Sequence, residues 1–253
     1  MLLTHHMAKV LITGSADGLG LLSAGLLISE GHSVVLHARN AERAKQALLR
    51  TPGASAVLIA DLSIPDETKS LAGKANELGT FDAVIHNAGV YQVSAKEIFA
   101  VNTLAPYMLT SLINIPGRLI YLSSGMHMHG QPKFDNFTRG QVSYSDSKLH
   151  VLMLAKAVAR RWRDVYANAV DPGWVPTSMG GPGAPEDLNK GFETQSWLSV
   201  SDHEKARVSG RYFKHMAERR YNTQADDVSL QEQLLSKCEE ITGVSFPGPN
   251  THQ

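Results

Sequence analysis

The stretch KVLITGSADGLG, residues 9–20, decides the fold of this 253-residue chain. Its first part, Lys9–Thr13, is a short apolar run that predicts a buried strand, and the apolar residues after Gly20 predict a helix. Gly14, Gly18 and Gly20 allow a tight turn between the two and let a pyrophosphate approach the free N–H groups of the helix. The spacing therefore favours a nucleotide-binding loop, with a glycine-rich turn that binds nothing as the alternative.

The rest of the chain alternates short apolar runs with helical patterns. This alternation predicts a single-domain α/β fold of the Rossmann type, a doubly wound parallel sheet with helices on both faces. We expect the domain over residues 8–253, after a disordered or vector-derived segment 1–7, with a substrate loop at about 178–205. The expected strands are 9–13, 33–38, 56–60, 83–86, 118–123, 167–170 and 211–214, and the expected helices are 19–29, 41–50, 66–78, 94–113, 143–162 and 226–240.

Composition restricts the partners. Lys plus Arg equals Asp plus Glu at 24 each, so no long-range field attracts nucleic acid or an anionic membrane, and a small molecule is the expected partner. Cys238 is the only cysteine, which excludes an intrachain disulfide, and no apolar run is long enough to span a bilayer. Without a signal peptide before the first strand, a cytoplasmic protein is expected.

The end of the second expected strand indicates which cofactor is used. Enzymes that use NAD usually place a carboxylate here to bind the ribose 2′-hydroxyl. This chain has Ala38 and Arg39 instead. Ala38 carries no charge that would repel a 2′-phosphate, and Arg39 offers such a phosphate a bidentate partner. NADP(H) is therefore favoured, and a solvent-facing arginine is the alternative. Asp17 in the glycine loop acts against this preference, because its carboxylate could repel the same phosphate.

A tyrosine and a lysine four positions apart begin the helix expected over 143–162. Tyr144 and Lys148 share one helix face, and a nearby ammonium lowers the pKa of a phenol towards the range useful for proton transfer. One such pair in a chain of this composition is a weak signal by itself.

Other candidate residues have a functional and a structural interpretation. His127 and His129 could suggest a metal pair, but no third ligand has a recognisable spacing, so pocket lining or loop capping is favoured and no metal is expected. Trp174, Met179 and Trp197 could form an apolar substrate wall or belong to the core.

The order of the motifs is far more specific than any one of them. After the glycine loop come His86-Asn87-Ala88-Gly89, Asn102, Ser123-Ser124, Tyr144 with Lys148, and Asp171-Pro172-Gly173. In this order and spacing the chain resembles the short-chain dehydrogenase/reductase family, densely over Lys9–Thr177 and more weakly beyond. The insertion Met126–Gln141 is similar to one in retinol-dehydrogenase-like and carbonyl-reductase-like members.

The resemblance implies a role for each of four catalytic residues. Tyr144 would be the general acid/base, and Lys148 would hold the nicotinamide ribose and tune Tyr144. Ser124 would hydrogen-bond the substrate oxygen, and Asn102 would hold a water that relays protons to Lys148. The cofactor-binding residues that it implies are Gly14, Ser15, Asp17, Gly18, Leu19, Gly20, Arg39, Asp61, Leu62, Asn87, Ala88, Gly89, Tyr144, Lys148, Pro172, Gly173, Val175 and Thr177.

The resemblance thus implies an NADP(H)-dependent oxidoreductase that interconverts a carbonyl and an alcohol by hydride transfer. A non-catalytic NADP-binding regulator on the same fold is the main alternative, although such a protein would not need the four catalytic residues. An epimerase or dehydratase of nucleotide sugars is another, although those relatives are usually longer. Family members also form homodimers and homotetramers, and the substrate stays open among steroids, retinoids, aldehydes, polyketides and small ketones.

Overall fold

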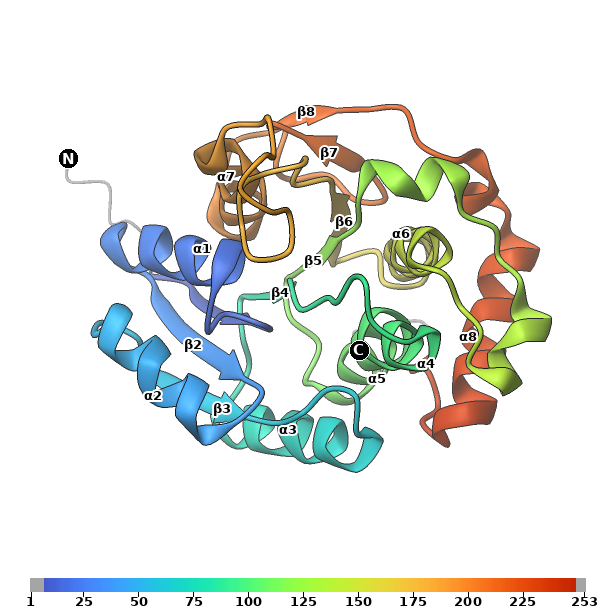
Figure 1. The fold of residues 1–253 in the computed structure, drawn as a ribbon, viewed down its shortest axis with the longest axis horizontal. Coiled ribbons are helices and arrows are strands. Elements are labelled where there is room, and N and C mark those ends of the chain that lie inside the picture. The colour runs from blue at the N-terminus through green and yellow to red at the C-terminus, as the bar shows by residue number, and fades with distance from the viewer. Residues whose placement is uncertain (1–6, 249–253) are drawn as a thin grey trace.

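One eight-stranded sheet lies at the centre of the protein in a computed structural model, which describes residues 7–248 (Figure 1). The strand order is β3-β2-β1-β4-β5-β6-β7-β8; neighbouring strands run parallel from β3 to β7, and β8 pairs antiparallel with β7. The strands are β1 (Lys9–Ile12), β2 (Ser33–Ala38), β3 (Ala56–Ile59), β4 (Ala83–His86), β5 (Arg118–Leu122), β6 (Tyr166–Val170), β7 (Tyr212–Lys214) and β8 (Ala217–Glu218). Apart from Met7, the segment expected at 1–7 lies outside the described residues.

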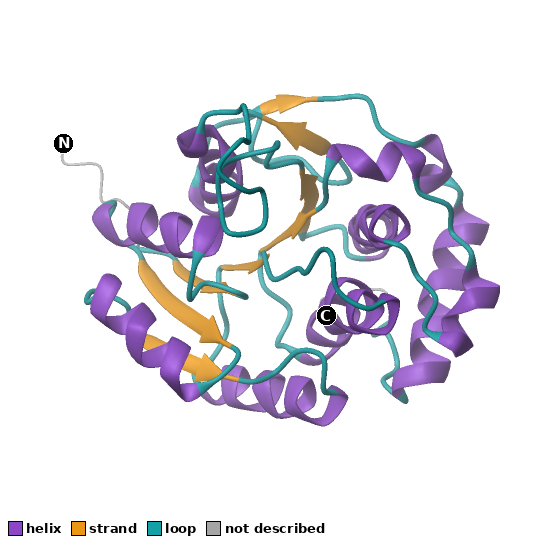
Figure 2. Cartoon of the chain, viewed as in Figure 1, coloured by secondary structure: helices purple, strands orange, loops and turns teal. Residues whose placement is uncertain are grey.

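Helices cover both faces of the sheet (Figure 2). Buried side chains of α1, α2 and α7 pack on one face, and those of α3, α5 and α6 pack on the other, where α8 lies against α5 and α6. This arrangement confirms the doubly wound sheet. The helices are α1 (Gly18–Ser29), α2 (Ala41–Arg50), α3 (Pro65–Glu77), α4 (Ala95–Phe99), α5 (Ala105–Leu112), α6 (Tyr144–Arg161), α7 (Leu188–Val200) and α8 (Val228–Thr242).

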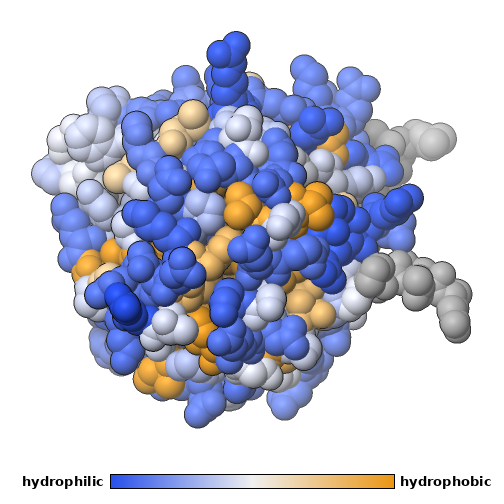
Figure 3. Space-filling model, turned by 90° about the vertical axis from the view of Figure 1, so that its right-hand side faces the viewer, coloured by the Kyte–Doolittle hydropathy of each residue, from blue (hydrophilic) through white to orange (hydrophobic). Residues whose placement is uncertain are grey.

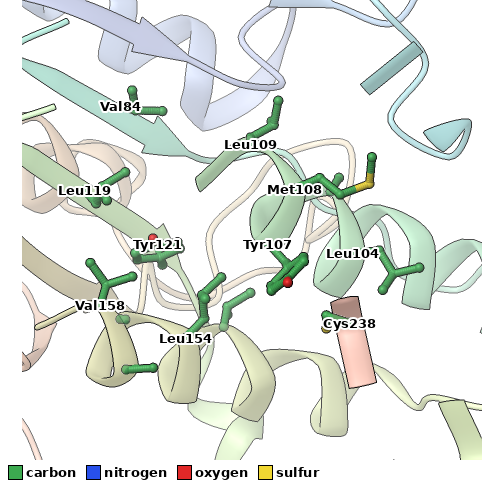
Figure 4. Close-up of a cluster of buried hydrophobic side chains, with 14 of the residues drawn as sticks. Val84, Leu104, Tyr107, Met108, Leu109, Leu119, Tyr121, Leu154, Val158 and Cys238 are labelled. Atoms are coloured by element: carbon green, nitrogen blue, oxygen red, sulfur yellow. The ribbon is translucent and has the colours of Figure 1, made fainter. Parts of the chain in front are cut away.

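The larger part of the core lies between the sheet and α5, α6 and α8. Figure 4 shows Val84 and Leu119 on the sheet facing Tyr107 of α5 and Leu154 of α6, with Cys238 of α8 beyond. All five side chains are buried. Burial of this much apolar surface fixes the position of α6, the helix that begins with Tyr144.

The helix expected over 94–113 is interrupted by the π-helical turn η1 (Ala100–Leu104) between α4 and α5. Pro106 lies near the start of α5 and has no N–H to donate to the carbonyl of Asn102, so the regular hydrogen-bond ladder cannot continue there. The interruption carries Asn102, which is buried.

The loop expected at about 178–205 ends at Asp187, where α7 begins. The sequence predicts only a polar, partly helical stretch here, because the buried face of α7 is mostly polar or small rather than apolar and lacks the usual periodicity. For example, Ser196 Oγ and Ser23 Oγ of α1 form a 2.7 Å hydrogen bond. Trp197 packs against Phe213 of β7, and it therefore does not belong to a substrate wall.

The insertion expected at Met126–Gln141 forms two 3₁₀ turns, η2 (Gly125–His129) and η3 (Phe134–Arg139). Together with α8 and η4 (Thr223–Asp226), these segments cover α6. Arg160 is the only exposed residue of α6, so this helix offers no apolar face to a second copy of the chain. The outer face over α8 is largely hydrophilic with scattered apolar groups (Figure 3).

Candidate active site

A cleft of about 380 Å³ lies at the carboxyl edge of the sheet and is lined by residues that follow β1 to β6. Open α/β sheets bind their ligands at this edge. The residues expected at a cofactor site that line this cleft are Gly14, Asp17, Gly18, Leu19, Arg39, Asp61, Leu62, Asn87, Ala88, Gly89, Tyr144, Lys148, Pro172 and Thr177.

The glycine loop is held tightly against the loop after β4. Gly14 has φ +63°, and a Cβ there would lie 2.8 Å from the Cα of Ala88, so only glycine fits. Asn87 Nδ2 donates to the carbonyl oxygens of Thr13 and Gly14 at 2.9 and 3.0 Å. The Asn87 side chain therefore fixes the glycine loop, while the residue also borders the cleft.

His37, at the end of β2, is a second support of the glycine loop, and the sequence did not indicate it. Its Nδ1 accepts from Gly14 N at 2.9 Å, so its Nε2 carries the proton and donates to the carbonyl of Ala60 at 3.0 Å. Burial lowers the pKa of His37, in keeping with a neutral ring. One side chain thus ties together the loops after β1, β2 and β3.

Four residues expected at the cofactor lie behind the cleft instead of lining it. Ser15 is fully buried; its Oγ donates to Ile12 O and accepts from His37 N. A Cβ on Gly20 would lie 2.5 Å from Gly14 O, so this glycine allows close packing of α1. The four residues are Ser15, Gly20, Gly173 and Val175, and they shape the walls.

Arginines gather at the end of the cleft beside β2. Arg39 is exposed and lines the cleft together with Arg43 of α2, which the sequence did not indicate. Asp17 is the N-cap of α1 and lies 3.5 Å from both Arg43 and Arg50. The hydrogen bond from Gly18 N, followed by the contact with Arg50, lowers the pKa of Asp17 although partial burial opposes this. The Asp17 charge is therefore paired with arginines beside the cleft.

Tyr144 and Lys148 line the other end, and Ser124 lies beside Tyr144, whereas its neighbour Ser123 lines the cleft itself. Tyr144 is the first residue of α6, which starts with a capping box between Ser143 and Asp146. Burial raises the pKa of Tyr144 to about 12, partly offset by a hydrogen bond with Ser124. The expected lowering by Lys148 is not found, and the phenol is a protonated donor at neutral pH.

Lys148 lies with its Nζ 5.4 Å from the centre of the Tyr144 ring and donates to Leu122 O at 2.8 Å. Burial lowers the pKa of Lys148 to about 8, and the Asp171 carboxylate acts in the opposite direction. Asp171 itself is buried after β6 and accepts from Gly173 N at 2.9 Å. The sequence had suggested only a motif position for Asp171, whereas the structure makes it a charge partner of Lys148.

Asn102 is buried beside these residues, but its polar atoms bind protein groups. Its Oδ1 accepts from Val90 N at 2.8 Å, and its Nδ2 donates to Val90 O at 3.0 Å and to Ser147 Oγ at 3.1 Å. Ser147 precedes Lys148 on α6, so Asn102 couples the loop after β4 to the helix that carries the tyrosine and the lysine.

Four exposed apolar side chains, Tyr91, Met126, Trp174 and Met179, belong to the segments that follow β4, β5 and β6. The Tyr91 ring centre lies 4.7 Å from that of Tyr144, and Met126 directly follows the Ser124–Gly125 corner. Trp174 is 59% exposed, yet its indole N–H donates to Gly180 O at 2.8 Å, which fixes the ring. Met179 is also exposed and lines the cleft. Clustered exposed apolar groups around a cleft indicate a ligand with an apolar part.

Two negative observations concern the described part of the chain. Among residues 7–248, no three or more His, Cys, Asp or Glu side chains are arranged to hold a metal ion. Across the same residues, no helix combines the length and the apolar character needed to cross a bilayer.

Comparison with known proteins decides the family. A family model described as short chain dehydrogenase matches residues 8–187, well over half of the chain. The chain belongs to the short-chain dehydrogenase family. An uncharacterized oxidoreductase of Emericella nidulans, AN7799, is 45% identical over 255 residues, which cover 96% of this chain and 100% of that protein. Retinol dehydrogenase 14 of Homo sapiens is 28% identical, over 94% of this chain and 87% of that one.

Solved structures show the same short-chain dehydrogenase fold. An uncharacterized protein of Mycobacterium paratuberculosis superposes with a TM-score of 0.76 at 22% identity, covering 95% of both chains. A short chain dehydrogenase of Shigella flexneri in complex with NADP superposes with a TM-score of 0.66 at 22% identity, covering 83% of this chain and 97% of that one. Membership of this family makes the protein an oxidoreductase that uses a nicotinamide cofactor and a small-molecule substrate.

Proposed function

We propose that this protein is an NADP(H)-dependent reductase that converts the carbonyl group of an aldehyde or ketone into an alcohol. The meeting of Tyr144 and Lys148 at one end of the cleft, with Ser124 beside Tyr144, carries the proposal, because it brings two hydroxyl groups and an ammonium together. A panel of aldehydes and ketones, followed by the absorbance of the reduced nicotinamide, tests it. We expect consumption of NADPH with at least one carbonyl compound.

The protein groups orient the carbonyl and supply its proton. The bound nicotinamide supplies the hydride. Ser124 and Tyr144 hydrogen-bond the carbonyl oxygen, and Tyr144 donates its proton as negative charge develops there. The pKa of about 12 suits Tyr144 to this donor role, and Lys148, with a pKa of about 8, remains an ammonium at neutral pH that stabilises the resulting phenolate. The same groups act in reverse when an alcohol is oxidised.

The opposite end of the cleft supports NADP(H). Gly14 lines the cleft where α1 begins, and the N-terminus of α1 suits a pyrophosphate. Arg39 and Arg43 line the cleft beside β2, where the ribose 2′ position of a dinucleotide is expected. Guanidinium groups are the preferred partners of phosphate, and pairing with arginines reduces the repulsion expected from Asp17. The structural relative from Shigella flexneri was solved with NADP.

The four exposed apolar side chains favour a carbonyl compound with an aromatic or other apolar substituent. Tyr91 and Trp174 offer ring faces, and Met126 and Met179 offer thioethers, which contact aromatic rings favourably. Tyr91 packs against the Tyr144 ring, and Met179 lines the cleft. An apolar substituent that leaves water for these side chains adds binding free energy in proportion to the area it buries.

Replacing Trp174 by Ala should lower kcat/KM for an aryl aldehyde by about 10-fold, because an aromatic contact contributes about 0.5–1.5 kcal/mol beyond its buried area. The loss should be smaller for a short aliphatic aldehyde, which cannot reach the indole. Ile241→Ala removes an exposed apolar side chain of α8 and serves as the control. Equal losses for both aldehydes would contradict this role of Trp174.

Replacing Asp171 by Asn should move the alkaline limb of the pH–rate profile for reduction to lower pH by about 1 unit. The Asp171 charge raises the pKa of both Lys148 and Tyr144, so its loss lowers both values. Reduction needs the protonated forms, which are then lost at lower pH as the pH rises. Asp135→Asn, at an exposed position of η3, is the control. An unchanged limb, or one at higher pH, would contradict this role.

A further inference from the structure

Both ring nitrogens of His127 contact backbone groups, and one of these groups is the carbonyl of Ser124. It is fully buried in the 3₁₀ turn η2 that begins after Ser124. Its Nδ1 lies 2.6 Å from the carbonyl oxygen of Ser124, and its Nε2 lies 3.2 Å from the backbone nitrogen of Asn222. Its ring centre is 4.6 Å from that of Tyr212 on β7.

These contacts define the proton position on the ring. A backbone N–H can only donate, so Nε2 must accept from Asn222, and Nδ1 carries the proton and donates to Ser124 O. Burial lowers the pKa of His127, although the Ser124 carbonyl and Asp171 oppose this. A neutral ring with the proton on Nδ1 is the only form that satisfies both partners.

The Ser124 carbonyl is held from two directions, since His127 N also donates to it at 3.0 Å. Ser124 has an extended backbone (φ −168°, ψ 153°), and its Oγ accepts from Met126 N at 3.2 Å. Fixing the carbonyl fixes the peptide plane after Ser124. That plane and the bond from Met126 N to Oγ together restrain the Ser124 side chain, which lies beside Tyr144.

The same histidine connects the serine to a distant part of the chain. Asn222 caps η4, and its Nδ2 donates to His127 O at 3.4 Å and to Gly130 O at 3.2 Å. The segment after β8 therefore clamps the turn that carries His127, 95 positions earlier in the sequence. The clamp brings the C-terminal segment into contact with the carbonyl-binding end of the cleft.

We propose that His127 is a positioning residue for carbonyl reduction: its Nδ1–H holds the Ser124 backbone so that the Ser124 hydroxyl points at the substrate oxygen. The assignment rests on the proposed function, because it gives Ser124 a role only if the protein reduces a carbonyl. His127 does not touch the substrate or the cofactor.

His127→Phe keeps the ring but removes the donor and the acceptor. We expect kcat to fall about 10- to 100-fold, since small misplacements of a reacting group cost this much, while KM for NADPH changes by less than about 2-fold. His127→Asn returns an N–H near the place of Nδ1 and should recover most of the lost kcat. His129→Phe is the matched control, because His129 is exposed two positions later.

A double-mutant cycle with Ser124→Ala separates positioning from a general effect on the fold. Once the hydroxyl is gone, His127→Phe has nothing to misplace and should add little further loss of kcat. If the fold-losses of kcat from the two single variants multiply in the double variant, the proposal is overturned. A wild-type kcat in His127→Phe, or an equal loss of kcat in His129→Phe, would also overturn it. If His127→Phe does not fold, His127→Asn replaces it in the cycle. His127→Asn alone should then retain most of the wild-type kcat. Its combination with Ser124→Ala should show no loss beyond that of Ser124→Ala alone.

A measurement on the wild type tests the contact without turnover. The ¹H–¹⁵N spectrum of the imidazoles should show His127 as a neutral ring with its proton on Nδ1 at neutral pH. A proton on Nε2, or a charged ring at neutral pH, would overturn the proposal. If the wild type reduces no carbonyl, the proposed function fails, and this spectrum still decides whether the His127–Ser124 contact exists.

Discussion

Replacing Tyr144 by Phe should lower kcat for carbonyl reduction by about 100-fold or more, because a general acid contributes at least this much. Only the hydroxyl is lost, so NADPH affinity should stay nearly unchanged. The ring still packs against Tyr91, which lies 4.7 Å away, and the start of α6 is still capped by Ser143. Steady-state kinetics and a fluorescence titration with NADPH measure the two quantities.

The control for this variant is Tyr166→Phe, which removes a hydroxyl from β6 at the opposite edge of the sheet. It should leave kcat near the wild-type value. If Tyr144→Phe retains more than about a tenth of the wild-type kcat, Tyr144 is not the proton donor.

The preference for NADPH over NADH should produce a similarly large difference in kcat/KM. With Ala38 and Arg39 at the end of β2, the wild type should use NADPH with a kcat/KM about 10- to 150-fold above that for NADH, since a charge-assisted contact contributes about 1.5–3 kcal/mol. Replacing Ala38 by Asp and Arg39 by Ser should reverse the preference. The new carboxylate repels the 2′-phosphate and offers a partner to the ribose hydroxyl.

Two single variants show which of the arginines near Asp17 contributes to the preference for NADPH. Arg43→Ser should also weaken NADPH use, because Arg43 lines the cleft and because its loss removes one of the arginines that pair with Asp17. Arg50→Ser is the matched control, since Arg50 also pairs with Asp17 but does not line the cleft. Equal kcat/KM values for both cofactors in the wild type would mean that Arg39 faces solvent only.

The sequence predicts those strands and helices that are marked by a regular pattern of apolar residues. The first six strands are short apolar runs, buried except for β3, and α6 combines a buried face with the Ser143–Asp146 capping box, so these were found with small differences at their ends. The bounds of α7 could not be given, and its stretch was expected to be only partly helical, because serine, threonine and glutamine fill its buried face. The two-residue strand β8 is too short for a pattern to show.

The candidate site was predicted where its residues form motifs along the chain. Ser124, Tyr144 and Lys148 came from their order in the sequence; Tyr144 and Lys148 line the cleft, and Ser124 lies beside Tyr144. His37 and Arg43 were missed because their roles depend on contacts between segments: the bond of His37 to Gly14, and the place of Arg43 beside Asp17. From the sequence, Asp17 is expected to repel the 2′-phosphate, because its arginine partners lie 26 and 33 positions away along the chain.

The most direct test of the proposed function is a product balance with the wild-type protein. Purified enzyme is incubated with NADPH and an aryl aldehyde, and the alcohol formed and the NADPH consumed are both quantified, with Tyr144→Phe in parallel. We predict one alcohol formed per NADPH consumed, with the rate reduced at least about 100-fold in the variant. Binding of NADPH without consumption, for every carbonyl compound offered and with no reaction from NADP and the corresponding alcohols, would contradict the assignment as a carbonyl reductase.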